Sequence, residues 1–465
     1  MTATVHTYSR LAIEDESDLI FGRSPKPVST RSGLVIGGGT VHPELNFTLP
    51  PMSISEASMP TVRTEYESMI NDALERAVAL DLAGLVVEFE LLPELTAQPS
   101  WGAEITAILR DALDRCHDRY GLLGALRVTP NDLREFIRPP LLREGEQWQR
   151  MIESFELCAG SGADLLAIES TGGKELHDDA IVAADLPAAV FALGVLAPRD
   201  MAFLWDRIVA IARDHDAIAS GDTACGFGNT AMVLAEMRHI PRVWAAVIRV
   251  MTVARSLVAY ERGATGPSKD CAYEGPYLKA ITGCPIALEG AESAVAHLSP
   301  VGNIAHAAAD LWSNESVANI KLLGGMAPTV SLEQLVYATR LMNAATASGC
   351  ERRLRDLFVL SDAERDPQAY VLRPDVVVEI SRQIVAASGA YARTRVAATA
   401  TLAALAAAYD AGTLTLPRRE LTWLQRLAAA AAELPESEEE LVARMLPVID
   451  RSKIRLDQYD LGSAL

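Results

Sequence analysis

The stretch Asp164-Leu-Leu-Ala-Ile-Glu-Ser170 joins a short apolar run directly to a carboxylate. Its apolar part shows no alternation of apolar and polar residues, which is typical of a parallel strand covered on both faces. Similar runs predict further strands, at residues 85–89, 124–128, 189–193, 218–220, 257–260, 286–288 and 319–323. Because neighbouring runs leave room for a helix between them, the pattern predicts an α/β fold, a (β/α)8 TIM barrel.

The regions on either side of the predicted barrel differ from it in pattern. Residues 1–60 are rich in turn signals and predict an N-terminal segment that wraps around the protein. Residues 61–335 hold the alternating strands and helices of the barrel. Residues 336–465 change to a helical pattern, with Ala- and Leu-rich stretches and a capping box formed by Ser437 and Glu440. We therefore expect a C-terminal helical extension after the barrel.

The composition excludes several classes of function. The chain has 465 residues, a formal net charge of −19 and no cluster of basic residues, so a general nucleic-acid or anionic-membrane binder is not expected. No uncharged run reaches the about 20 strongly apolar residues of a membrane span. The 6 cysteines form no CxxC pair and are too few for a disulfide framework. We expect a soluble, cytoplasmic protein.

Three potential metal ligands follow predicted strands. Glu169 lies in the stretch quoted above, Cys225 closes Ile218-Ala-Ser-Gly-Asp-Thr-Ala-Cys, and Cys271 lies in the loop after residues 257–260. In a barrel the carboxyl ends of the strands meet on one face, where catalytic groups lie. One carboxylate and two thiolates supply three ligands for Zn²⁺ and leave a fourth position for substrate, and thiolates disfavour Mg²⁺. The alternative is that both cysteines fill the core, as free cysteines usually do.

Other motifs carry weaker signals. The stretch Gly226-Phe-Gly-Asn-Thr-Ala231 resembles a dinucleotide fingerprint, but no acidic residue follows at a strand end about 20 positions later, so we disfavour a dinucleotide site. His297 and His306 flank a loop near the presumed barrel mouth. Each is a candidate for a fourth ligand or a proton carrier, and the alternative for each is an ordinary loop or core histidine.

A set of segments spread over most of the chain carries a family resemblance. These are Pro99-Ser-Trp-Gly-Ala-Glu104, Glu169-Ser-Thr-Gly-Gly-Lys-Glu175, Gly221-Asp-Thr-Ala-Cys225, Arg255-Ser-Leu-Val-Ala-Tyr-Glu261, Lys269-Asp-Cys-Ala-Tyr-Glu274, Lys279-Ala-Ile-Thr-Gly283, Trp312-Ser-Asn-Glu-Ser-Val317 and Asp366-Pro-Gln-Ala-Tyr370. At these residues the chain resembles the zinc-dependent methanol:corrinoid methyltransferase family, the large subunit of a methanol-activating complex. Departures from the family pattern occur at Ala224, Phe227-Gly228 and Met326-Ala-Pro-Thr329. They leave the metal ligands unchanged and alter the edge of the expected pocket.

The resemblance implies the chemistry of the site. In that family one Glu and two Cys hold the metal, which places Zn²⁺ on Glu169, Cys225 and Cys271 in a barrel with helical additions. It also implies methanol as the methyl donor and a small corrinoid-binding partner protein as the acceptor. Because the oxygen of methanol is a poor leaving group, we expect zinc to bind that oxygen while the Co(I) state of the corrinoid attacks the methyl carbon.

Further residues take expected roles from their position near the metal ligands. Asp222, Asp270 and Glu274 are candidates for the acid that protonates the departing oxygen, and the sequence does not rank them. Glycine-rich rims would let a flat macrocycle approach the barrel mouth closely. These glycines are Gly172, Gly173, Gly226, Gly228, Gly324 and Gly325. The expected assembly is a homo-oligomer within a hetero-oligomeric complex.

Two other functions remain open at this point. A related zinc methyltransferase would take its methyl group from another small donor, such as a methoxy compound or a methylated amine. A zinc-stabilised barrel without catalysis would serve only as the partner of a corrinoid carrier. A screen of methyl donors with reduced cobalamin separates the two enzymes, and the third function predicts no turnover with any donor.

Overall fold

The computed structural model describes residues 5–270, 274–289, 300–317, 321–322 and 325–462. Its central sheet consists of parallel strands in the order β7-β6-β5-β4-β3-β10-β9-β8. Strands that follow one another in the chain lie side by side, and the first barrel strand, β3, pairs with the last, β10. The strands are β3 (His42–Thr48), β4 (Gly84–Leu91), β5 (Leu123–Pro130), β6 (Leu165–Ile168), β7 (Ile218–Asp222), β8 (Ser268–Asp270), β9 (Ile286–Glu289) and β10 (Leu311–Val317).

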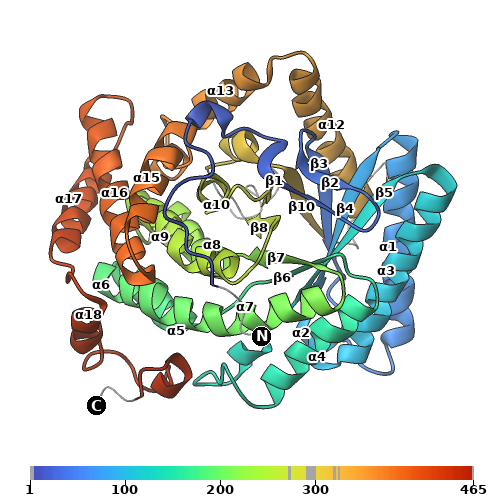
Figure 1. The fold of residues 1–465 in the computed structure, drawn as a ribbon, viewed down its shortest axis with the longest axis horizontal. Helices are drawn as coiled ribbons and strands as arrows, with labels where there is room; N and C mark the ends of the chain where they lie inside the picture. The colour runs from blue at the N-terminus through green and yellow to red at the C-terminus, as the bar shows by residue number, and fades with distance from the viewer. Residues whose placement is uncertain (1–4, 271–273, 290–299, 318–320, 323–324, 463–465) are drawn as a thin grey trace.

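The two outer strands of this sheet, β7 and β8, also follow one another along the chain. The amide of Thr265, just before β8, donates to the carbonyl of Ala219 on β7 at 2.9 Å. The hydroxyl of Ser220 on β7 donates to the carbonyl of Pro267 at 2.5 Å. These bonds bring the edges of the sheet together, which confirms the predicted TIM barrel (Figure 1).

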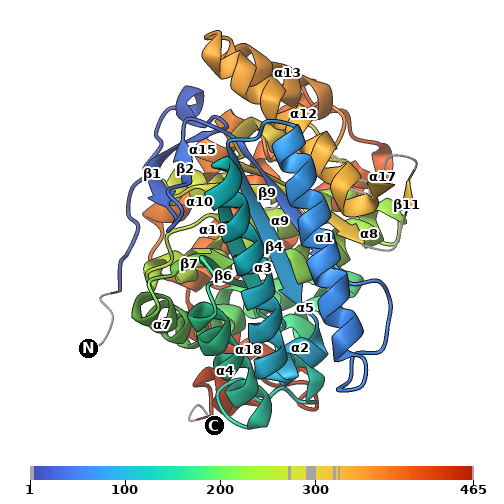
Figure 2. The ribbon, with the colours of Figure 1, turned by 90° about the vertical axis from the view of Figure 1, so that its right-hand side faces the viewer.

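Helices surround the barrel. Figure 2 shows α1 and α3 lying side by side across the outer face of β4. The helices that follow or connect the strands are α1 (Met59–Ala79), α2 (Pro93–Ala97), α3 (Pro99–Tyr120), α4 (Glu146–Gly160), α5 (Lys174–Ala183), α6 (Leu186–Phe191), α7 (Ala197–Asp214), α8 (Cys225–Glu236), α9 (Arg242–Glu261), α10 (Gly275–Thr282) and α12 (Ala327–Ala347). They bury the apolar outer face of the strands.

Strand β4 shows how the barrel separates its two faces. Leu85, Val87 and Phe89 are fully buried in the apolar layer beneath the helices. The alternate residues face the barrel axis, because successive side chains of a strand point to opposite faces. Of these, Glu88 is fully buried in the interior. The interior of the barrel is therefore charged toward the carboxyl ends of its strands.

Two predicted strands are wrong. Residues 189–193 lie in α6 and the π-helical turn Ala192–Leu196 that follows it, and residues 257–260 lie in α9. Both runs are apolar because helices surround them, and a short apolar run does not distinguish a buried helix from a strand. The predicted strand at residues 319–323 falls partly outside the described residues. Its described part, Lys321–Leu322 (β11), forms a hairpin with Gly325–Met326 (β12) and is not in the barrel.

The N-terminal segment is more ordered than predicted. Residues 1–60 were expected to be irregular, but they contain the barrel strand β3 and a hairpin of β1 (Arg23–Ser29) and β2 (Val35–Gly38). Leu34 and Ile36 of the hairpin are buried against residues of five barrel strands, namely Val86, Ala125, Leu165, Ala287 and Leu311. Several of these residues lie at or near the first positions of their strands. The hairpin therefore closes the end of the barrel opposite to the carboxyl ends of the strands.

The C-terminal region is helical, as predicted, and covers α9 (Figure 1). Its helices are α13 (Glu351–Asp362), α14 (Pro367–Tyr370), α15 (Pro374–Ala386), α16 (Ala390–Asp410), α17 (Arg418–Ala432) and α18 (Glu438–Met445), the last capped by Ser437 on the amide of Glu440. Two segments, Leu186–Asp214 and Arg242–Glu261, are long and apolar enough to span a membrane by composition. However, 78% and 100% of their most apolar windows are buried inside the protein.

Candidate metal centre

Glu169 and Cys225 are carried by neighbouring strand ends. Strand β6 ends at Ile168, which lies opposite Asp222, the last residue of β7. The amide of Thr223 then donates to the carbonyl of Ile168 at 3.2 Å, so the two segments remain paired for one residue beyond the strands. Glu169 directly follows Ile168 at the end of β6, and Cys225 begins α8 three residues after the end of β7. The structure thus brings both predicted ligands to the carboxyl end of the barrel.

Cys225 is almost completely buried, with 1% of its surface exposed. It is not surrounded only by hydrocarbon, because the hydroxyl of Thr223 donates to the Cys225 sulfur at 2.8 Å. The same hydroxyl accepts from the Cys225 amide at 3.2 Å. The Cys225 sulfur is disulfide-bonded in this structure, so the hydrogen bond shows that its surroundings are polar and does not show a thiolate.

The third predicted ligand, Cys271, lies outside the described residues, but the chain on both sides of it is described. Asp270, one residue earlier, lies on β8 opposite Leu288 of β9. Glu274, three residues later, is fully buried and accepts a hydrogen bond from the amide of Ala224 at 2.9 Å. Both flanking residues are therefore at the same barrel end as Cys225. Among the residues that the structure describes, no group of three His, Cys, Asp or Glu side chains is arranged to hold a metal ion.

The three candidate acids differ in their hydrogen bonds. Asp222 is fully engaged: it accepts from Arg255 at 2.6 Å on one oxygen and from the indole of Trp205 at 3.0 Å on the other. Glu274 accepts from Ala224 and from the hydroxyl of Ser256 at 2.7 Å, both on Oε1. Its Oε2 atom is buried and has no hydrogen-bond partner among the described residues. The backbone of Asp270 is described, and its side chain is not.

Two of the six candidate glycines are explained by packing. Gly172 is buried, and a Cβ atom there would lie 2.4 Å from the side chain of Asp200. Gly173 is buried with φ +86°, a conformation that favours glycine, and its amide donates to the hydroxyl of Tyr459 at 2.9 Å. Neither glycine presents an accessible surface to a partner.

The remaining glycines lie in different surroundings. Gly226 is partly exposed in the first turn of α8, where a Cβ atom would lie 3.5 Å from Lys174. Gly228 is buried in the same helix. Gly325 is partly exposed at β12, and Gly324 lies outside the described residues. Only Gly226 and Gly325 therefore have the exposure that a docking rim needs, among the candidates that the structure describes.

His306 is a core histidine. Its ring stacks between Trp312, at a centroid distance of 3.4 Å, and Phe358, at 4.7 Å. Burial lowers the pKa of His306 to about 3. A ring that stays neutral at physiological pH and faces two aromatic side chains is not placed to carry a proton to the barrel mouth. His297, the other candidate, lies outside the described residues.

This low pKa predicts a pH dependence of stability. The unfolded chain binds a proton on His306 below about pH 6.5, and the folded protein does not until about pH 3. The contribution of neutral His306 to the free energy of unfolding is therefore fully present above pH 6.5. It decreases by about 1.4 kcal/mol for each pH unit as the pH falls below that value. Urea unfolding of wild type and His306→Phe between pH 7 and 5 measures it. The variant is expected to show the shallower slope, and equal slopes would contradict the prediction.

Sequence reasoning missed a charged cluster inside the barrel. The ammonium group of Lys269 lies 3.2 Å from Glu88, 2.9 Å from Glu90 and 3.4 Å from Glu289. Burial raises the pKa of Glu88 to about 7, although Lys269 opposes the shift. The signal was present as charges at alternate positions of an apolar strand, since Glu88 and Glu90 point to the same face. The three carboxylates therefore fix the position of Lys269, which lies two residues before Cys271 in the sequence.

Sequence reasoning also missed Arg255, which lies in a helix that is otherwise apolar at this end. The guanidinium is fully buried and donates to Ser170 and Asp222, next to the two predicted ligands described above. A buried charge requires partners, so an arginine inside an apolar helix is itself a signal of a buried polar site. Because the sequence predicted a strand at residues 257–260, the position of Arg255 inside an apolar helix was not recognised.

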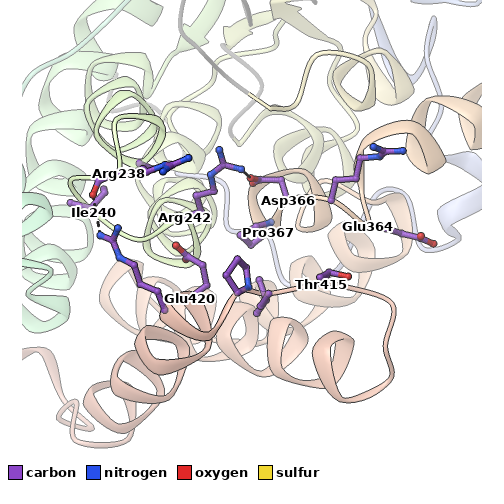
Figure 3. Close-up of a pocket in the computed structure, with 13 residues that line it drawn as sticks. Arg238, Ile240, Arg242, Glu364, Asp366, Pro367, Thr415 and Glu420 are labelled. Atoms are coloured by element: carbon purple, nitrogen blue, oxygen red, sulfur yellow. Dashed lines mark hydrogen bonds and ion pairs between the residues drawn. The ribbon is translucent and has the colours of Figure 1, made fainter.

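A surface cavity of about 680 Å³ lies away from these residues, between the end of α8, the connection from α13 to α14 and the start of α17 (Figure 3). Its wall contains Arg242, which donates to Asp366 at 2.7 Å. Burial raises the pKa of Asp366 to about 6. None of the predicted site residues lines this cavity. Its size alone gives no reason to place the reaction there.

Comparison with known proteins identifies the family of this chain. The family model for the methanol-cobalamin methyltransferase B subunit matches residues 5–460. The methanol–corrinoid protein co-methyltransferase of Methanosarcina barkeri is 37% identical over 433 residues, which cover 92% of this chain and 93% of the relative. The crystal structure of the methanol:cobalamin methyltransferase complex MtaBC from Methanosarcina barkeri contains a chain that superimposes with a TM-score of 0.93 at 36% identity, covering 97% of this chain and 99% of that one. The chain belongs to the methanol-cobalamin methyltransferase B subunit family.

Proposed function

We propose that this chain transfers the methyl group of methanol to the cobalt of a corrinoid that a separate, smaller protein carries. The main support is that the family match covers nearly the whole chain, so the barrel, the N-terminal hairpin and the helical extension are all shared. The relative of 37% identity is named for this reaction. Glu169, Cys225 and the residues on both sides of Cys271 lie at the carboxyl end of the barrel, which supports this proposal.

The metal of this proposal is Zn²⁺, held by Glu169, Cys225 and Cys271. Two observations favour a metal here over core packing. Cys225 receives a hydrogen bond on its sulfur, and Glu274 has a buried oxygen without a hydrogen-bond partner among the described residues. The donor set of two thiolates and one carboxylate suits zinc and leaves one position for substrate. Zinc bound there supplies a Lewis acid that activates the alcohol oxygen for departure.

The protein must also deliver a proton, because methyl transfer breaks the carbon–oxygen bond of methanol and leaves the oxygen to depart as water. We assign this proton to Oε2 of Glu274. Its other oxygen is held by Ala224 and Ser256, which fixes the direction in which Oε2 points. Asp222 is a weaker candidate, since Arg255 and Trp205 occupy both of its oxygens.

A corrinoid presented by its carrier protein would have to approach from outside the barrel mouth. The closed end of the barrel, filled by Leu34 and Ile36, leaves the carboxyl ends of the strands as the side for this approach. Gly226 and Gly325 are the described rim glycines with partial exposure, and small residues there permit close contact. A reducing cytoplasm suits the proposal, because the ligand thiols must not be oxidised.

Elemental analysis combined with a donor assay tests the proposal. The purified chain is expected to contain about one zinc per polypeptide and to convert reduced cobalamin to methylcobalamin with methanol. Removal of zinc by a chelator should stop the reaction, and added zinc should restore it. Transfer from a methoxy compound or a methylated amine, but never from methanol, would replace the donor in this proposal. A zinc-containing chain that transfers methyl groups from no donor would leave only the non-catalytic role.

A further inference from the structure

Arg255 occupies the centre of the polar network behind the predicted ligands. It lies on α9, a helix that is apolar on most sides because the barrel and the C-terminal helices enclose it. The Arg255 side chain is only 1% exposed. A guanidinium in such a place is stable only when its donors are satisfied, so its partners define its role.

Those partners are the two strand ends that carry Glu169 and Cys225. One terminal nitrogen of Arg255 donates to the carbonyl of Ser170 at 3.1 Å, to its hydroxyl at 2.5 Å and to Asp222 at 2.6 Å. The other donates to the carbonyl of Thr223 at 3.3 Å. Ser170 directly follows Glu169, and Thr223 lies two residues before Cys225. A single planar group therefore bonds the backbone beside each ligand.

Neighbouring residues extend the same network to the third segment. The residue after Arg255, Ser256, donates to Glu274, and Glu274 accepts from the amide of Ala224. Two consecutive residues of α9 thus contact the ends of β6 and β7 and the chain that follows Cys271. The aromatic ring of Phe227 covers the guanidinium at 4.6 Å from the ring centroid and helps to keep water away from it.

We propose that Arg255 is a positioning residue that holds Glu169 and Cys225 at the separation that metal binding requires. This inference rests on the proposed function, because it assigns a role toward the zinc ion. Arg255 acts through backbone carbonyls and Asp222 and does not contact the metal itself. Its positive charge also offsets the negative charges that two thiolates and a carboxylate bring together. Removing residues that orient metal ligands typically weakens metal affinity by about 10–100-fold.

The test compares Arg255→Met with Arg393→Met. Arg393 is a matched control: it is 3% exposed and forms an ion pair with Glu261, the last residue of α9, and it makes none of the hydrogen bonds of Arg255. Zinc affinity is measured by competition with a chromophoric chelator, and the visible spectrum of the Co²⁺-substituted protein reports the ligand geometry. Arg255→Met is expected to bind zinc about 10–100-fold more weakly and to shift the Co²⁺ bands. Arg393→Met should keep both readouts while losing stability.

Arg255→Lys serves if Arg255→Met does not fold. Lysine keeps the charge but cannot reach Ser170, Asp222 and Thr223 together, so a smaller loss of zinc affinity is expected. Wild-type zinc affinity and an unchanged Co²⁺ spectrum in a folded Arg255 variant would overturn the positioning role of Arg255 and leave the proposed metal centre intact. A wild-type protein that binds no zinc would instead overturn the metal centre, and the role of Arg255 with it.

Discussion

Replacing Cys225 with serine is expected to remove bound zinc and to slow methyl transfer by about 1,000-fold or more, a barrier increase of about 4 kcal/mol. A serine hydroxyl stays protonated at neutral pH and does not replace a thiolate as a zinc ligand. The fold should survive, because serine is nearly isosteric with cysteine and Thr223 still bonds the helix start. Zinc content, circular dichroism and the rate of cobalamin methylation check the three parts of this expectation.

Cys350→Ser is the control for this substitution. Cys350 is exposed at the start of α13, so its replacement should leave zinc content and rate unchanged. Cys158→Ser is a second control, because Cys158 is fully buried in the apolar core. It should lower stability without removing zinc. A Cys225→Ser protein with full zinc content and the wild-type rate would exclude Cys225 as a ligand.

The apolar runs in the sequence predicted the barrel but not all of its strands. Strands such as β4, β5 and β9 contain apolar runs because helices cover their outer faces. Strand β3 carries Glu44 and Asn46 toward the interior, and β8 is the short polar sequence Ser268–Asp270. A barrel whose interior is charged near its site therefore hides the strands that build the site. An apolar-run search instead finds buried helices such as α9.

The candidate site was predictable to the extent that chemistry depends on residue type. Glu169 and Cys225 follow strands that the sequence identifies, and the structure places both residues at the carboxyl ends of the neighbouring strands β6 and β7. The orienting residues depend on packing between distant segments, which a sequence does not display. Asp222 illustrates the difference: its type and position suggested a proton donor, and only the structure shows that Arg255 and Trp205 occupy both of its oxygens. Gly172 likewise faces Asp200 and not a docking partner.

Replacing Arg127 with methionine is expected to lower the free energy of unfolding by about 3–5 kcal/mol. Arg127 and Glu44 form a fully buried pair in the barrel interior, with nitrogen–oxygen distances of 2.5 and 3.2 Å. The arginine also donates to the hydroxyl of Ser220 at 2.6 Å and to the carbonyl of Pro267 at 2.7 Å, across the junction of β7 and β8. The substitution leaves Glu44 charged, buried and without its partner. Chemical denaturation measures the loss.

A double-mutant cycle separates the stability due to the Arg127–Glu44 ion pair from the stability due to the other contacts of Arg127. Glu44→Leu removes the charge that Arg127→Met leaves unpaired, so the double variant should be more stable than Arg127→Met alone. Two apolar residues of similar volume in place of a buried ion pair are often close to neutral in stability. The double variant nevertheless lacks the bonds from Arg127 to Ser220 and Pro267, which join the strands before Cys225 and Cys271. It should therefore regain most of its stability but bind zinc more weakly than wild type. Purely additive losses of stability would show that Arg127 acts through Ser220 and Pro267 and not through Glu44.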